Sequence, residues 1–209
     1  LDEKTTLHNV TIQKALRMMD SKLLDAFDVS KAPVKMLGAF GDSQFGRGCL
    51  AAIQLIKAGV RCVEVTLDGW DTHLNNHEGH AKLNAVLDPA FAALICELRA
   101  RELLDQTVVI CGGEFGRTPK VNGLGGRDHW PKGFSVALAG GGFKGGHVHG
   151  KTDPEGQSEE PEDPIKVADI HSTVLHALGI EHNKEMMTPI GRPMEISKGK
   201  MIKTLLKDK

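Results

Sequence analysis

The stretch that decides the predicted fold is residues 107–130, TVVICGGEFGRTPKVNGLGGRDHW. Its first five residues are β-branched or otherwise apolar and glycines follow them, which is typical of a buried strand. Gly112 and Gly113 let the backbone turn sharply and approach a ligand closely. A group of polar side chains comes directly after this turn. Because ligands of open α/β sheets bind beyond the carboxyl ends of the strands, we expect a site here.

Helices and strands are predicted to alternate along the rest of the chain. Apolar residues recur at helical spacing in some segments, and short β-branched runs separate these segments. This βαβ pattern predicts an α/β protein with a mostly parallel sheet. The predicted helices cover residues 46–59, a segment opened by Asp88 and Pro89, and residues 167–178, and the predicted strands cover 60–67, 107–111 and 134–139.

The composition argues against partners that are held by bulk charge. The chain has 209 residues, of which 40% are hydrophobic, so it is long enough to bury one sizeable core. Its 26 basic and 27 acidic side chains nearly cancel, which disfavours a nucleic-acid partner. No apolar run in the sequence reaches the length of a membrane span. Cys49, Cys62, Cys96 and Cys111 form no CxxC motif, and we expect free, buried thiols, with a disulfide pair as the alternative.

Side chains that ligate metals follow two of the predicted strands. Asp71 and His73 come after one strand, and their spacing of two points both side chains the same way in an extended segment. Glu114 follows another strand, and Asp128 and His129 lie beyond it. Because parallel strands bring their carboxyl ends to one edge of a sheet, we expect these five residues to converge. Carboxylate and imidazole ligands suit Zn²⁺, with Mn²⁺, Mg²⁺ or Ca²⁺ as alternatives.

Two arginines accompany this predicted metal site. Arg117 and Arg127 offer bidentate donors for an anionic group, and His129 is placed to transfer protons, so these three are the predicted catalytic residues. The alternative interpretation is a strand followed by a solvated loop, in which arginine and aspartate pair locally. His77 and His80 are interpreted as the exposed start of the next helix.

Several motifs together resemble an uncharacterised branch of the alkaline-phosphatase-like superfamily, catalogued as a domain of unknown function and often labelled sulfatase-like. The resemblance implies a three-layer α/β/α sandwich with a metal site at the carboxyl edge of the sheet, and hydrolysis or transfer of phosphate or sulfate esters. The motifs are GWDTH (69–73), GEFGRTP (113–119), GGRDHWP (125–131), AGGGFKGG (139–146) and DIHSTVLHALGI (169–180).

The resemblance also assigns individual residues. Asp71 and His73 are similar to mid-chain metal ligands of the superfamily, and His129 is similar to its late histidine ligand. Glu114 stands where the superfamily usually has aspartate. Phe115 is a departure, because phosphatases and sulfatases have histidine or asparagine at that position.

The superfamily carries its first metal-binding aspartate and its nucleophile in an N-terminal portion, and members of the branch are longer than this chain and exported. The resemblance therefore implies that residues 1–209 are a single α/β domain, the C-terminal portion of a longer alkaline-phosphatase-like domain, from a periplasmic or otherwise exported precursor.

Two functions follow from these observations. The first is a metal-dependent hydrolase of sulfate or phosphate esters, present here without its nucleophile-bearing half, whose partner is an anionic small molecule or a sulfated or phosphorylated polymer. The second is a non-catalytic binding or scaffold protein that retains the fold and part of the metal site. Fold alone does not decide between them.

Overall fold

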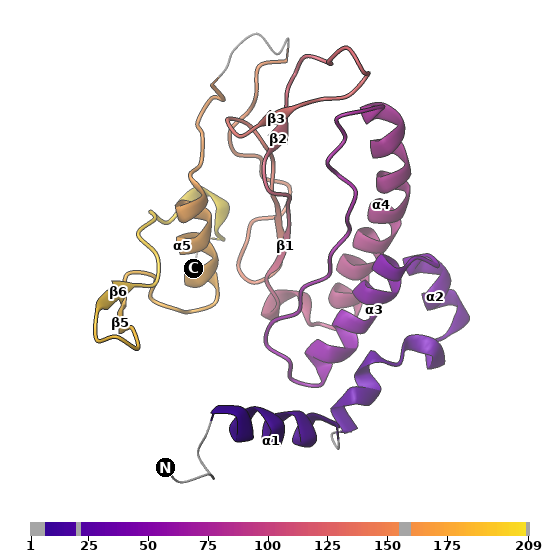
Figure 1. Cartoon of the computed structure of the whole chain (residues 1–209), viewed down its shortest axis with the longest axis vertical. Coiled ribbons are helices and arrows are strands. Elements are labelled where there is room, and N and C mark those ends of the chain that lie inside the picture. The colour runs from indigo at the N-terminus through magenta and orange to yellow at the C-terminus, as the bar shows by residue number, and fades with distance from the viewer. Residues whose placement is uncertain (1–6, 20–21, 155–159, 208–209) are drawn as a thin grey trace. The chain divides into compact units, whose positions relative to one another are not determined.

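The computed structural model describes residues 7–19, 22–154 and 160–207 (Figure 1). The chain divides into two compact units. The first unit comprises Leu1–Trp70 and His80–Glu97, and the second comprises Asp71–Gly79 and Leu98–Lys209.

The described elements are mostly helices and short strands. The α-helices are α1 (Leu7–Met19), α2 (Val34–Phe40), α3 (Gln44–Lys57), α4 (Asn76–Ala100) and α5 (Val167–Ala177). Short 3₁₀ helices are η2 (Lys22–Phe27), η3 (Val29–Lys31), η4 (Leu104–Gln106) and η5 (Lys203–Leu205). The strands are β1 (Val109–Cys111), β2 (Gly116–Arg117), β3 (His129–Trp130), β4 (Ala137–Ala139), β5 (Glu185–Met187) and β6 (Pro193–Glu195).

Helix α3 supplies most of the core of the first unit. It begins after Ser43, whose Oγ accepts a hydrogen bond from the Gly46 N–H at 3.0 Å and so caps the helix. Cys49, Leu50 and Ile53 are buried on its apolar face. Gly59 follows in the left-handed region at φ 90°, which a side chain would disfavour. The predicted helix at 46–59 is therefore confirmed.

The predicted strand at residues 60–67 is wrong. This segment is extended, and Val63, Val65 and Leu67 are half-buried between exposed neighbours, but no strand pairs with it in the described part of the chain. It packs on α3 instead: a Cβ on Gly48 would lie 2.8 Å from Val65 Cγ1. The alternation of apolar residues in 60–67 thus reflects packing of one side of the segment on α3. Without a hydrogen-bonded partner strand, the extended segment is not part of a sheet.

The predicted α/β sandwich with a mostly parallel sheet is also wrong. All three strand pairs of the described chain are antiparallel and two-stranded: β1 with β4, β2 with β3, and β5 with β6. Strands do form within 107–111 and 134–139, but Val109 pairs with Ala139 directly, without a crossover. Ile110, in the middle of β1, is 51% exposed. A parallel sheet needs helices over both faces, and this exposure shows that one face of the pair lacks such a cover.

Helix α4 corrects one further prediction, and helix α5 of the second unit confirms another. The predicted helix start at Asp88 and Pro89 is wrong, because α4 begins at Asn76 and runs through Pro89. An internal proline removes one helical hydrogen bond and costs about 3 kcal/mol, so α4 must be held by its packing. His77 and His80 fall in the first turns of α4, as predicted, and His77 is exposed. His80 is half-buried instead, with its ring edge-on to Trp70 at a centroid distance of 5.2 Å. The helix predicted at 167–178 is confirmed as α5.

The structure bears on the expectation of free, buried thiols and on the expectation that no segment spans a membrane. All four cysteines are free thiols, but only Cys49 is buried; Cys111 is half-buried, and Cys62 and Cys96 are exposed. Of the helices in the described chain, none combines the length and the apolar character that crossing a membrane requires.

Candidate metal centre

Two loops of the second unit are joined through their backbones, and this junction builds the site. Leu74 forms an antiparallel bridge with Gly125, and the Asn76 N–H donates to the Gly125 carbonyl at 2.9 Å. The Arg127 N–H donates to the Thr72 carbonyl at 3.1 Å. A Cβ on the residue between these contacts, Gly126, would lie only 1.9 Å from the His73 carbonyl oxygen. Only glycine fits there, so this close approach depends on Gly126.

The short hairpin of β2 and β3 positions Arg117 and His129 next to the two joined loops. Arg117 on β2 pairs with His129 on β3, and directly opposed residues of an antiparallel pair project to the same face. The Thr118 N–H donates to the Asp128 carbonyl at 2.9 Å and extends this pairing. The hairpin therefore holds Arg117 and His129 next to one another and beside the joined loops.

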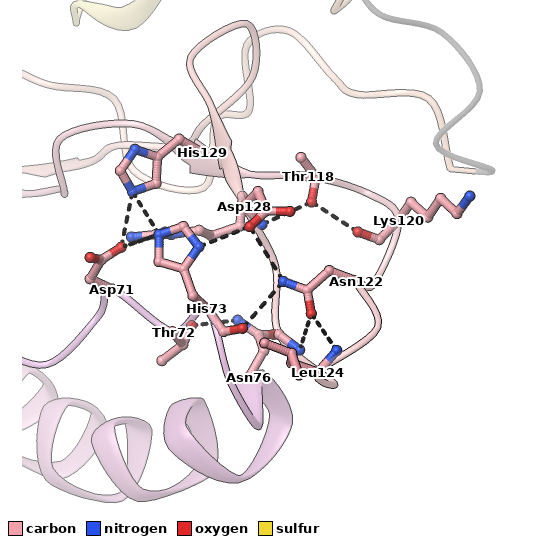
Figure 2. A network of polar contacts seen from close by, with 12 residues as sticks. Asp71, Thr72, His73, Asn76, Thr118, Lys120, Asn122, Leu124, Asp128 and His129 are labelled. Carbon is pink, nitrogen blue, oxygen red and sulfur yellow. Dashed lines mark hydrogen bonds and ion pairs between the residues drawn. The ribbon is translucent and has the colours of Figure 1, made fainter.

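Three potential ligand atoms converge in a nearly equilateral triangle (Figure 2). His73 Nε2 lies 3.1 Å from His129 Nε2, and His129 Nε2 lies 3.0 Å from Asp71 Oδ1. The third side, from His73 Nε2 to Asp71 Oδ1, is 3.1 Å. The side chains are between 44% and 64% exposed, so the triangle opens to solvent.

Asp128 contacts the opposite side of the His73 ring. Its Oδ1 lies 2.8 Å from His73 Nδ1, and a carboxylate oxygen accepts hydrogen bonds, so Nδ1 carries the proton. In the neutral ring the Nε2 lone pair then points toward Asp71 Oδ1, which is also an acceptor. Two acceptors 3.1 Å apart repel unless a proton or a cation lies between them. A donor on His129 Nε2, which lies 3.0 Å from the same Asp71 oxygen, or a cation in the triangle would relieve this repulsion.

Arg117 provides a positive charge at the edge of the triangle. Its Nη1 lies 2.7 Å from Asp71 Oδ1, and its side chain is only 11% exposed. Its Nη2 lies 3.9 Å from Glu114 Oε1. The Phe115 ring packs against both His129 and Arg117, with its centroid 4.5 Å from that of His129 and 5.8 Å from the Arg117 Cζ. Arg117 therefore shares Asp71 with the two histidines.

Both aspartates of the site are held in the charged form. The hydrogen bond from His129, followed by the interaction with Arg117, lowers the pKa of Asp71 from 3.8 to about 2. Hydrogen bonds from His73 and then from Asn122 lower the pKa of Asp128. A hydrogen bond to a carboxylate favours its ionised form, so neither group needs to lose a proton before it meets a cation near neutral pH.

The predicted site residues fall into three groups. Asp71, His73 and His129 form the triangle, although 56 to 58 positions separate His129 from the other two. Asp128 joins the cluster through His73 Nδ1, away from the triangle. Glu114 lies beside Arg117, with its side chain 65% exposed.

Arg127, the second predicted catalytic arginine, contacts the backbone of its own loop. Its Nη1 donates to the Thr118 carbonyl at 2.6 Å and also to the Pro119 carbonyl. The guanidinium therefore holds the loop between β2 and β3 in place.

Arg127 also borders a pocket of about 330 Å³ in the second unit, lined by Arg117, Pro119, Arg127, Trp130, Thr152, Asp153 and Pro154. Arg117 thus belongs both to this pocket and to the edge of the triangle.

Sequence reasoning missed two residues that support the site. Asn122 donates from Nδ2 to Asp128 Oδ1 at 3.3 Å and to the His73 carbonyl at 3.2 Å. Thr118 Oγ1 accepts from the Asp128 N–H at 3.1 Å. The Asn122-Gly123 pair is a common turn signal, but such a signal indicates only a turn and not which distant residues the asparagine side chain meets.

Fold and site together define a largely helical protein with a solvent-open cluster of one carboxylate and two imidazoles. A family model described as "Protein of unknown function (DUF1501)" matches residues 2–206, and the chain belongs to this family. No curated protein and no solved structure matches the chain. The family match agrees with the part of the motif resemblance that pointed to a domain of unknown function.

Proposed function

We propose that this protein binds a divalent cation through Asp71, His73 and His129 and uses it to hydrolyse phosphate or sulfate esters. The triangle of ligand atoms carries the proposal. One carboxylate and two imidazoles are a donor set found in catalytic zinc sites, which keep an open position, and in the facial triads of Fe²⁺. Zn²⁺ is the first candidate, and Mn²⁺, Mg²⁺, Ca²⁺ and Fe²⁺ are the alternatives.

The size of the triangle fits an ion bound on its open face. With bonds of about 2.05 Å, neighbouring ligands of a tetrahedral ion are about 3.3 Å apart, and those of an octahedral ion about 2.9 Å. The observed sides of 3.0 to 3.1 Å lie between these values. Asp71, His73 and His129 would hold such an ion with its remaining positions open to water or substrate, because the triangle faces solvent.

The residues around the triangle have separate tasks in the proposed reaction. Asp128 fixes the protonated nitrogen of His73, because a carboxylate on Nδ1 leaves Nε2 free as a ligand. His129 serves as a ligand once the Nε2 proton that it donates to Asp71 in the metal-free protein has moved to Nδ1 or to solvent, and a nitrogen lone pair that binds a cation cannot also accept a proton. This proposal therefore replaces proton transfer by His129. When bound, a divalent cation supplies Lewis-acid polarisation of a phosphoryl or sulfuryl oxygen.

The substrate class rests on the arginines and on the resemblance to alkaline-phosphatase-like enzymes. Arg117 lies next to the triangle and lines the pocket, so an anionic group between the cation and the pocket would meet a guanidinium. Trp130 and two prolines offer apolar surface to the organic part of the ester. Arg127 strengthens the positive potential of the pocket while its Nη1 holds the loop.

Metal content and turnover test the proposal in sequence. The purified protein, prepared without chelators, is analysed by elemental mass spectrometry and titrated with each candidate cation by calorimetry. We expect about one bound ion per triangle, followed by hydrolysis of 4-nitrophenyl phosphate or 4-nitrophenyl sulfate in its presence. A protein that takes up none of these cations would refute the proposal at its first step.

The position of Phe115 favours a second candidate function. Where the phosphatases and sulfatases that the motifs resemble have a metal ligand, this side chain packs against the His129 ring at a centroid distance of 4.5 Å, with the two rings tilted by 52°. A metal-binding protein without catalysis, which presents the cation and the arginine pocket to an anionic partner, accounts for the same geometry. Binding of metal and of phosphate without any turnover of the two esters would select this candidate.

A further inference from the structure

The Asn122 side chain forms hydrogen bonds around His73. Its Nδ2 donates to the His73 carbonyl at 3.2 Å and to Asp128 Oδ1 at 3.3 Å. The same Asp128 oxygen lies 2.8 Å from His73 Nδ1. One amide nitrogen therefore contacts both the backbone of the histidine and the carboxylate that orients its ring (Figure 2).

The other end of the Asn122 amide belongs to the turn. Its Oδ1 accepts from the Leu124 N–H at 2.9 Å and from the Gly126 N–H at 3.0 Å. The amide oxygen thus accepts the hydrogen bonds that hold the turn at residues 122–126, and the amide nitrogen donates to His73 and Asp128. A side chain that served the turn alone would need only the acceptor.

We propose that Asn122 is a positioning residue for the metal centre, acting through Asp128 to keep His73 Nε2 directed at Asp71 and His129. This inference rests on the proposed metal-binding function. With its donor hydrogen bonds in place, Asn122 sets the separation between the His73 backbone and the Asp128 carboxylate, and the imidazole spans that separation. Without them Asp128 Oδ1 turns away, and the neutral ring loses its preference for a proton on Nδ1.

The substitution Asn122→Asp separates the two roles. Aspartate has nearly the same size and keeps an oxygen acceptor for the turn, but it removes the N–H donors. The added negative charge by itself strengthens cation binding. The new carboxylate also repels Asp128, whose Oδ1 lies 3.3 Å from the amide nitrogen that it replaces, so a loss of affinity in this variant reports the lost donors together with this repulsion. The uncharged variant Asn122→Ser isolates the loss of the donors. Asn122→Ser, which also keeps an oxygen and removes the amide, is the second variant, and circular dichroism verifies the fold of both.

Two measurements test the proposal. The first is the affinity for Zn²⁺ and Co²⁺ in the wild type, Asn122→Asp, Asp128→Ala and the double variant. We expect Asn122→Asp to weaken binding about tenfold, as substitutions of groups that orient ligands do. In the Asp128→Ala background the same change should cost less than about twofold, because residues that act through one another are not additive.

The second measurement needs no metal. Long-range ¹H–¹⁵N correlation spectra of the chelated protein report which nitrogen of His73 is protonated. We expect a proton on Nδ1 in the wild type and a mixture of tautomers in Asn122→Asp and Asn122→Ser.

Each outcome decides the question. Wild-type tautomer and affinity in both Asn122 variants would overturn the proposal, as would equal losses with and without Asp128. A wild type that binds no metal would refute the proposed function alone, and the tautomer comparison would then decide the role of Asn122.

Discussion

Replacing His129 with alanine should remove one of the three ligand atoms and leave the other two in place. Its Nε2 lies 3.0 Å from Asp71 Oδ1 and 3.1 Å from His73 Nε2, so the expected loss of metal affinity comes from the removal of this one ligand atom. Structural zinc sites with four ligands bind with about 10–16 kcal/mol, or roughly 3 kcal/mol per ligand. Since about 1.4 kcal/mol is a factor of ten, we expect affinity to fall roughly a hundredfold.

The assay is competition between the protein and a fluorescent zinc chelator, supported by the visible absorption spectrum of the Co²⁺ form. His77→Ala is the matched control, because His77 is an exposed histidine at the start of α4 and belongs to the same unit. The control should bind as the wild type does. Thermal unfolding in the presence of a chelator monitors the lost packing between His129 and Phe115. If His129→Ala binds zinc within about threefold of the control, the triangle is not the metal site.

Three other predictions concern the charge, the ionisation and the backbone of the site. Arg117→Met should tighten metal binding about fivefold or more, because it removes a cation 2.7 Å from Asp71 Oδ1, and it should weaken phosphate binding. Calorimetry with the metal and with phosphate measures the two changes in affinity. Weaker metal binding in this variant would show that Arg117 mainly positions Asp71. The pKa of Asp71 falls from 3.8 to about 2 on folding, so its contribution to stability is present above about pH 4 and is lost as the pH falls toward 2. The difference in urea midpoint between the wild type and Asp71→Asn, in chelator, should shrink over that range, and a constant difference would contradict the assignment. Gly126→Ala should destabilise the protein by about 1–3 kcal/mol and abolish metal binding, because its Cβ would meet the His73 carbonyl oxygen at 1.9 Å. Gly123→Ala, where a Cβ meets nothing within 4 Å, is the control, and equal effects of the two changes would refute the argument.

Much of the local structure was predictable because its interactions are local. The helices α3 and α5 and the start of α4 near His77 follow from apolar spacing and glycine stops, since helical hydrogen bonds join residues close in sequence. Asp88 and Pro89 misled the prediction, because the same residue types that begin a helix are tolerated inside one when its packing is favourable. The residue types of the candidate metal centre were also recognisable, since carboxylates and imidazoles are the side chains that divalent metal ions need.

The arrangement of the site was not predictable in the same way. The sequence suggested that Asp71 and His129 meet at the edge of a parallel sheet, and the structure brings them together through the bridge between Leu74 and Gly125 and the hairpin of β2 and β3. Glu114 and Asp128 looked equivalent as ligands in the sequence. The structure places one beside Arg117 and the other behind His73.

The sequence by itself therefore determined the helices α3 and α5, the short strand at Val109–Cys111 and the chemical types gathered after it. Tertiary structure alone decided that β1 pairs antiparallel with β4, that residues 60–67 pack on a helix, and that three ligand atoms form one triangle. The physical reason is the range of the interactions. A helix forms its hydrogen bonds within itself, whereas a strand or a metal site needs partners far along the chain, and an apolar or polar pattern does not specify which partners those are.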